Sequence, residues 1–192
     1  MPDIRPRKRA AQGRSRATVA AITEAAARIL ADEGLDAVTT NAVAMRAGVS
    51  IGSLYQYYPN REAILADLLR GKLTRLADEV ERAAAQTTFD AGLHAMLLAV
   101  GRSYIERPAL AAALLYVESL IEGDAEIAAL RAKLGRMTVV FLRRYGVRDP
   151  ELAARDITAL ARGMALAAGL SGERDVEALV GRMERAVRGY LG

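Results

Sequence analysis

The stretch from Thr39 to Arg61, TTNAVAMRAGVSIGSLYQYYPNR, decides the fold because it predicts two short helices that meet at a glycine turn. Thr39 or Thr40 can cap the first helix, since a side-chain oxygen at that position accepts an unpaired amide hydrogen. Gly48 ends the first helix, because glycine adopts the left-handed backbone conformation without a steric clash. Ser50 is placed to cap the second helix. The pattern is that of a helix-turn-helix.

The second helix is short, and a third segment follows it directly. Tyr58 precedes Pro59, and proline pushes the residue before it out of helical geometry, so the second helix ends near Tyr57. Asn60 caps the third segment, and Glu62 in its first turn is favoured by the helix dipole.

These residues resemble the DNA-binding signature of the tetracycline-repressor (TetR) family, over roughly the first 70 residues of the chain. The positions that carry the resemblance are Thr39-Thr40, Val43-Ala44, Ala47-Gly48-Val49-Ser50, Leu54-Tyr55, Tyr57-Tyr58-Pro59 and Arg61-Glu62-Ala63. The other two thirds resemble the family in length and helical character alone. Ile51 and Gly52 depart from the family pattern at the leading edge of the reading helix, which concerns the operator sequence rather than the fold. Arg61 stands where lysine is usual and keeps the charge.

The positive charge of the chain lies with this motif. The 192 residues carry a net charge of +4; residues 1–72 hold 11 Lys/Arg and 7 Asp/Glu, whereas residues 73–192 hold 16 of each. The basic residues among the first sixteen are Arg5, Arg7, Lys8, Arg9, Arg14 and Arg16, against Asp3 alone. We expect residues 1–16 to form a flexible basic arm for a polyanion. The alternative is a solvated tail without a partner.

The sequence excludes several classes of function. There is no cysteine, so disulfides, thiolate metal sites and cysteine nucleophiles are absent. Leu110 to Val117, the longest uncharged apolar run, is far shorter than the roughly 18 residues of a membrane span. No signal peptide is visible, and we expect a cytoplasmic protein of bacterial type, associated with the nucleoid when bound to DNA. Phosphate-binding glycine loops and catalytic motifs are also missing, so we expect no enzyme, cofactor or metal site.

Helical periodicity runs through the rest of the chain and predicts an all-α fold of about nine helices. We expect a helix-turn-helix DNA-binding domain over residues 17–62 and a helical regulatory and dimerisation domain over residues 63–192, beyond the arm. The expected helices outside the motif are 17–33, one from beyond Pro59 to 85, 89–106, 108–121, one from beyond the 122–124 turn to 145, 151–170 and 174–191. The hydrophobic fraction of 52% allows this chain a sizeable core.

Side chains along one edge of the second motif helix are candidates for reading bases. Gln56 can pair bidentately with adenine, and Ile51 can contact a thymine methyl group. The base-reading candidates are Asn41, Ile51, Ser53, Gln56 and Tyr57, and the phosphate candidates are Thr39, Thr40, Tyr55, Arg61, Arg14 and Arg16. Each residue has an alternative as a solvated surface group, and the tyrosines have an alternative in the domain core, where we place Tyr58.

The carboxyl-terminal helices combine apolar residues with small residues spaced by four, which permits close helix approach. The dimer-interface candidates are Leu160, Gly163, Met164 and Ala167. Alternatively, these faces complete the core of the monomer. The dimer is favoured because a two-fold pair presents two reading helices about one DNA turn, ~34 Å, apart, and the TetR resemblance implies the same.

The middle helices hold candidates for a small-molecule pocket, each of which is otherwise an ordinary core or surface residue. These candidates are His94, Met96, Leu97, Tyr104, Leu114, Tyr116, Glu118, Met137 and Phe141. The sequence therefore predicts a sequence-specific transcriptional regulator, a homodimeric repressor released from a palindromic operator by a small-molecule effector. The alternatives are a basic helical protein that binds DNA without sequence choice and a helical protein-interaction module.

Overall fold

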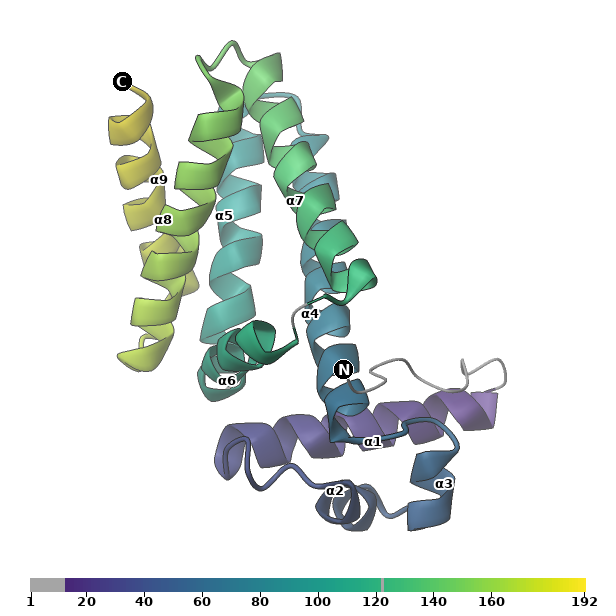
Figure 1. Cartoon of the computed structure of the whole chain (residues 1–192). Coiled ribbons are helices and arrows are strands. Elements are labelled where there is room, and N and C mark those ends of the chain that lie inside the picture. Colours follow the sequence, from purple (N-terminus) through teal and green to yellow (C-terminus); the bar gives the residue numbers. More distant parts are fainter. Residues whose placement is uncertain (1–12, 122) are drawn as a thin grey trace. The chain divides into compact units, whose positions relative to one another are not determined.

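A computed structural model describes residues 13–121 and 123–192, and these residues form nine helices and no strand (Figure 1). The prediction of an all-α chain is confirmed. The helices are α1 (Gly13–Asp32), α2 (Thr40–Ala47), α3 (Ile51–Tyr55), α4 (Arg61–Ala84), α5 (Phe89–Ile105), α6 (Pro108–Leu120), α7 (Ala125–Arg144), α8 (Pro150–Leu170) and α9 (Val176–Leu191). Within this described part of the chain, no helix is long and apolar enough to cross a membrane.

The observed helix bounds differ most from the sequence prediction at the first helix. α1 begins at Gly13, whereas the apolar pattern indicates a start near Ala17. Residues 13–16 of the predicted arm are therefore helical, which suits their lack of proline. The rest of the arm, residues 1–12, lies outside the described residues, as does the side chain of Arg14.

The chain divides into two compact units. Unit 1 comprises Met1–Gly71 together with Ala113–Ile127, and unit 2 comprises Lys72–Ala112 together with Ala128–Gly192. The helices α4, α6 and α7 each contribute residues to both units. The corner between α6 and α7 thus belongs to the same unit as the helix-turn-helix, although the segment Lys72–Ala112 of unit 2 separates them in sequence.

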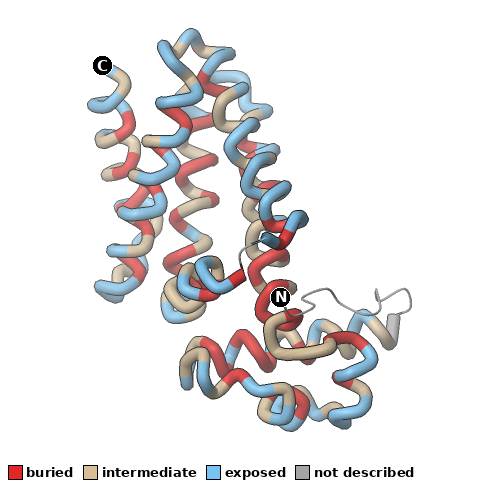
Figure 2. The backbone as a smooth tube through the Cα atoms, in the orientation of Figure 1, coloured by how far each residue is buried: buried red, intermediate tan, exposed pale blue. Residues whose placement is uncertain are grey.

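The core of unit 1 contains the apolar stripe of α1 together with buried residues of α2, α3 and α4. Figure 2 shows the buried positions along these helices. The largest fully buried side chains of this unit are Ile22, Ile29, Leu30, Val38, Val43, Leu54, Tyr58 and Ile64. α1 therefore supplies the apolar support that a pair of short helices cannot supply for itself.

Unit 2 is built around α5, whose buried positions run along most of its length (Figure 2). Glycines let the neighbouring helices come close to it. A Cβ on Gly92 would lie 2.3 Å from the Phe141 ring of α7, and one on Gly101 would lie 3.1 Å from Val176 of α9. Gly169 of α8 is equally close-packed, since a Cβ there would lie 2.9 Å from the backbone oxygen of Tyr104.

We predict that Gly92→Ala destabilises unit 2, because the Phe141 ring has little freedom to move. That ring is buried, stacks on Phe89 at 5.5 Å and meets Tyr145 edge-on at 5.2 Å between ring centroids. Overpacking of this kind lowers the free energy of unfolding by about 1–3 kcal/mol, which urea unfolding measures.

Gly135→Ala is the matched control for Gly92→Ala. Gly135 is also inside a helix, and no described atom lies within 4 Å of its Cβ position. Alanine there should raise stability by about 0.5–1 kcal/mol, because it restricts the unfolded chain more than glycine does. Equal effects of the two substitutions would contradict the close contact between α5 and α7.

Candidate nucleic-acid interface

The turn of the helix-turn-helix has the geometry that the sequence predicts. Thr39 is the capping residue of α2, and its hydroxyl accepts a hydrogen bond of 3.1 Å from the Ala42 amide. Gly48 lies in the left-handed region with φ 66° and ψ 30°. The amide of Val49 then donates to the carbonyl oxygen of Ala44 at 3.0 Å, which closes the end of α2. The predicted stop at Gly48 is confirmed.

α3, the short second motif helix, is capped at its first turn. The hydroxyl of Ser50 accepts a hydrogen bond of 3.1 Å from the Ser53 amide and lies 2.8 Å from the Ser53 hydroxyl. Leu54 is the buried residue of α3, while Ile51 and Gln56 are exposed. Leu54 thus anchors α3 to the core, and the opposite face is open to a partner.

Two contacts between side chains fix α2 relative to its neighbours. The hydroxyls of Thr40 and Tyr55 lie 3.2 Å apart and join the start of α2 to the end of α3. Arg46 of α2 forms an ion pair of 2.6 Å with Glu33, which directly follows α1. Thr40 and Tyr55, both predicted phosphate contacts, therefore lie together on the surface of unit 1.

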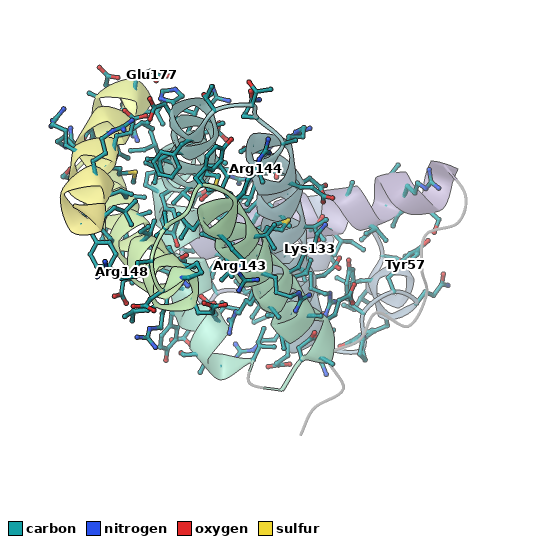
Figure 3. All side chains as sticks on the ribbon, turned by 90° about the horizontal axis from the view of Figure 1, so that it is seen from above. Tyr57, Lys133, Arg143, Arg144, Arg148 and Glu177 are labelled. Atoms are coloured by element: carbon teal, nitrogen blue, oxygen red, sulfur yellow. The ribbon has the colours of Figure 1, made fainter. Side chains whose placement is uncertain are left out.

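The structure places most of the predicted base-reading residues on the surface. Asn41, Ile51 and Gln56 are exposed, and Ser53 is half-buried. The prediction for Tyr57, which Figure 3 labels, is corrected, because this residue is only 8% exposed and its hydroxyl accepts a hydrogen bond of 3.1 Å from Ser15 of α1. α3 ends at Tyr55, and the turn that follows carries Tyr57 inward toward α1, so we remove Tyr57 from the base-reading set.

The start of α4 follows the motif and also matches the prediction. The side-chain oxygen of Asn60 accepts a hydrogen bond of 2.9 Å from the Ala63 amide, which caps α4. Arg61 is half-exposed and forms a 3.0 Å ion pair with Glu62. A surface pair of this kind is weak, so the guanidinium of Arg61 remains available to a phosphate.

A buried polar cluster behind the motif is the feature that sequence reasoning missed. We call Tyr58, Asp67, Arg70 and Asp124 the Arg70 cluster. The hydroxyl of Tyr58 donates to Asp67 at 2.5 Å, and Arg70 donates to Asp124 at 2.8 Å. Arg70 is 6% exposed and Asp124 8% exposed. The available signal was the Asp67 and Arg70 pair, one helical turn apart in the otherwise uncharged stretch from residue 63 to residue 71 of α4.

The basic residues of α7 and of the turn after it belong to unit 2, not to the unit that holds the motif. Figure 3 labels four of them, Lys133, Arg143, Arg144 and Arg148. Lys133 pairs with Glu81 at 2.7 Å, and Arg143 pairs with Glu151. The guanidinium of Arg144 lies over the Tyr145 ring, 5.3 Å from its centroid. Much of this charge is therefore engaged within unit 2.

The predicted pocket residues are divided between the two units. Met96, Leu97, Tyr104 and Phe141 are buried and Met137 is half-buried in unit 2, while Leu114, Tyr116 and Glu118 belong to unit 1. The assignment of Tyr116 to the pocket is corrected, because Tyr116 is 59% exposed and does not line an apolar interior. His94 is half-buried, and its ring nitrogens lie 3.0 Å from Glu184 and 3.6 Å from Glu177 on α9.

The predicted dimer residues lie on the outer side of α8. Gly163 and Ala167 are exposed, and Leu160 and Met164 are half-buried. Leu152 and Leu170, on the same helix, are among the exposed large apolar side chains. α8 therefore turns a face of small and apolar residues away from the core of unit 2.

Comparison with known proteins identifies the motif region. Residues 22–68 match the model of the family described as bacterial regulatory proteins, tetR family. The chain is also 30% identical, over 131 residues, to the HTH-type transcriptional repressor KstR of Mycolicibacterium smegmatis, and the match covers 67% of this chain and 63% of that repressor. The chain belongs to the TetR family. The chain spans less than two thirds of KstR, so family membership does not assign the whole activity of KstR to this chain.

Solved structures show that the likeness in fold extends over most of the chain. The TetR-family regulator PfmR from Thermus thermophilus superposes with a TM-score of 0.73 at 22% identity and covers 87% of this chain and 97% of its own. The fatty acid degradation regulator FadR from Bacillus halodurans gives a TM-score of 0.76 at 20% identity, over 91% and 95% of the two chains. At these identities the likeness concerns the fold alone.

We predict that the stability of this TetR-family chain falls as the pH rises above about 10, the ordinary pKa of tyrosine. Burial raises the pKa of the Tyr58 hydroxyl, and the charge of Asp67 and the hydrogen bond to it raise the pKa further. A group whose pKa is raised by folding stabilises the protein fully below its unfolded value and loses that contribution above it. Tyr58→Phe should therefore flatten the alkaline fall in the free energy of unfolding.

The measurement is urea unfolding between about pH 8 and 11, on either side of the ordinary tyrosine pKa, with Tyr190→Phe as the control. Tyr190 also donates to a carboxylate, Asp156 at 2.8 Å, but its side chain is exposed and solvent screens the pair. Tyr190→Phe should keep most of the alkaline slope. If Tyr58→Phe keeps it as well, the Tyr58 hydroxyl is not held by Asp67 in solution.

Proposed function

We propose that this chain is a sequence-specific DNA-binding transcriptional regulator, and that it acts as a repressor. One observation carries the proposal: α3, the second motif helix, is capped by Ser50 and anchored by Leu54, and it keeps an exposed face in the region that matches the TetR family. A helix held in this way is suited to the major groove. The similarity to KstR, a transcriptional repressor, supports the direction of regulation.

In this proposal Gln56, Ile51, Ser53 and Asn41 lie nearest the bases. Gln56 is exposed and can form two hydrogen bonds to adenine, while Ile51 can contact a thymine methyl group. The half-buried Ser53 is restricted by its contact with Ser50, so we expect it to contribute less than Gln56.

The phosphate contacts come from residues that flank the base-reading edge. Tyr55 and Thr40 form one group through their paired hydroxyls, and Arg61 stands at the start of α4. Thr39 and the basic residues Arg14 and Arg16 complete the proposed set. Such contacts fix the position of the protein on the duplex and add affinity without adding sequence preference.

In this proposal α1, α2 and α3 form the DNA-binding domain, and residues 63–192 form the regulatory and dimerisation domain. The proposed effector is a small, largely apolar molecule, because the pocket candidates Met96, Leu97, Tyr104 and Phe141 are buried and mostly apolar. The name of FadR, a regulator of fatty acid degradation, favours the same chemistry. No catalytic step is part of the proposal, and binding of chromosomal DNA places its action in the cytoplasm.

We predict that Gln56→Ala and Arg61→Ala weaken DNA binding in different ways. The test begins with selection of bound sequences from random duplex DNA by the wild-type protein, which should yield a palindrome. Gln56→Ala should relax the preference at one symmetric pair of positions, at about 1–3 kcal/mol for each bidentate contact. Arg61→Ala should weaken all sequences alike and reduce the salt dependence of binding.

The same experiment separates the proposal from its alternatives. Wild-type protein that binds every sequence with similar affinity would be a basic DNA-binding protein without sequence choice. Wild-type protein that binds no duplex would favour a protein-interaction module. If Gln56→Ala selects the wild-type palindrome unchanged, Gln56 does not read the bases.

We predict that Gly163→Leu weakens a homodimer formed through α8, because a leucine prevents the close approach that a glycine allows. A palindromic operator needs two copies of α3 related by a two-fold axis, which motivates the dimer. Sedimentation over a range of protein concentrations should show a dissociation constant raised about tenfold or more, which is the size of effect that overpacking of a close contact produces.

Gly135→Leu is the matched control for the dimer. Gly163 and Gly135 are both exposed within long helices, and no described atom lies within 4 Å of either Cβ position. Leucine should therefore be accepted by the folded monomer at both sites, since it is a good helix former. A dimer that is equally strong in both variants would exclude α8 as the interface.

A further inference from the structure

The Arg70 cluster joins the DNA-binding motif to the corner between α6 and α7. Tyr58 stands directly after Gln56 and Tyr57, Arg70 lies in the first half of α4, and Asp124 precedes the first residue of α7. All belong to unit 1. The chain enters the corner from α6 and leaves it in α7, and both helices continue into unit 2. The corner is thus a segment through which the regulatory helices meet the motif.

Asp124 is the principal partner of the Arg70 charge. Three carboxylates surround the guanidinium: Asp124 at 2.8 Å, Asp67 at 3.5 Å and Glu126 at 3.7 Å. The Glu126 side chain is 64% exposed, so water screens its pairing with Arg70. Arg70 and Asp124 are both buried, and a buried charge without a partner is strongly unfavourable. Arg70 therefore depends on Asp124.

Asp124 also fixes the start of α7. One of its carboxylate oxygens accepts hydrogen bonds of 2.9 Å from the amides of both Glu126 and Ile127, and the other accepts the bond from Arg70. A single side chain therefore caps α7 and ties it to α4. If the corner moves, the cap and the buried ion pair move together.

Asp67 is shared between Tyr58 and Arg70. One carboxylate oxygen of Asp67 accepts the 2.5 Å hydrogen bond from Tyr58, and the other lies 3.5 Å from the Nη2 atom of Arg70. Nη2 is buried and, among the described residues, has no hydrogen-bond partner. The Nη2 group of Arg70 can therefore donate a hydrogen bond to Asp67. Without Asp124, the carboxylates near Arg70 would be those of Asp67 and Glu126, and Asp67 is the less exposed of the two.

We propose that Asp124 and Arg70 are positioning residues for the reading helix: while Asp124 holds Arg70, the Asp67 carboxylate stays within hydrogen-bond distance of Tyr58, and Tyr58 holds the end of α3 in its DNA-binding position. When the corner withdraws Asp124, Arg70 closes onto the other oxygen of Asp67, 3.5 Å away, and draws that carboxylate away from Tyr58. The end of α3, which carries Gln56, then loses its anchor. The α6–α7 corner is in this way the regulatory input to the motif, and the inference rests on the proposed DNA-binding function.

The test compares Asp124→Asn with Asp175→Asn in the full-length protein. Asparagine at position 124 keeps an oxygen for the α7 cap but loses the charge that holds Arg70. Asp175 caps α9 in the same way, accepting from the Ala178 amide at 3.0 Å, and is not part of the Arg70 cluster. On the palindrome selected by the wild type, Asp124→Asn should bind about tenfold more weakly, and Asp175→Asn should bind as the wild type does.

A second measurement needs no DNA. The amides of Tyr57 and Tyr58 both donate to the Leu54 carbonyl at the end of α3. Their hydrogen exchange should be about tenfold faster in Asp124→Asn, and unchanged in Asp175→Asn. By reciprocity, Tyr58→Phe should speed exchange of the Ile127 amide, which donates to Asp124. Tyr58→Phe removes a single hydroxyl and keeps the ring, so it supplies a folded protein should Asp124→Asn fail to fold.

A double-mutant cycle distinguishes a positioning role from general destabilisation. Tyr58 and Asp124 have no direct bond among the described contacts, so independent effects on the DNA dissociation constant would multiply. We expect Tyr58→Phe to weaken the wild type and to have almost no further effect in Asp124→Asn. Effects that multiply, or wild-type exchange at Tyr57 and Tyr58 in Asp124→Asn, would overturn the inference. Wild-type protein without any DNA preference would overturn the proposed function, while the exchange measurements would still decide the linkage.

Discussion

The shortness of the reading helix is the constraint on which the rest of the structure depends. α3 has five residues, from Ile51 to Tyr55, and an isolated helix of that length is not stable in water. Its geometry is imposed from outside, by the cap from Ser50, by the burial of Leu54 and by the anchors on Tyr57 and Tyr58 that follow it. Those inward-facing contacts set the position of every outward-facing group on α3, and of Gln56 after it.

This dependence explains which segments of the chain make up unit 1. α1 packs against α2, and α2 packs against α3, but apolar contact is non-directional and leaves the end of α3 free to shift. The hydrogen bond from Tyr58 to Asp67 has a direction, and the Arg70 cluster extends it to residue 124. That is a physical reason for residues 113–127 to join the motif in one compact unit, far from it in sequence.

The contrast between what the sequence predicted and what it did not follows from the range of the interactions. Ser50, Gly48 and Asn60 act within three or four residues, and the rules that relate them to helix ends are local. Arg70 and Asp124 are 54 residues apart, and no local pattern pairs them. Tyr57 was misassigned for a different reason: it lies three residues after the buried Leu54 and shares that inward-facing side, and its hydroxyl accepts a hydrogen bond from Ser15.

The charges behind the motif also bear on how a regulator of this kind can switch. A set of apolar residues of equal volume would hold the corner as firmly as the buried ion pair or more firmly, since desolvation offsets much of the attraction between charges. Apolar packing, however, tolerates small displacements. A buried arginine held between two aspartates has discrete alternatives, because the planar guanidinium donates only to carboxylate oxygens that lie in line with its hydrogens. A displacement of the α6–α7 corner too small to break apolar packing therefore suffices to exchange the partner of Arg70, and with it the position of Tyr58.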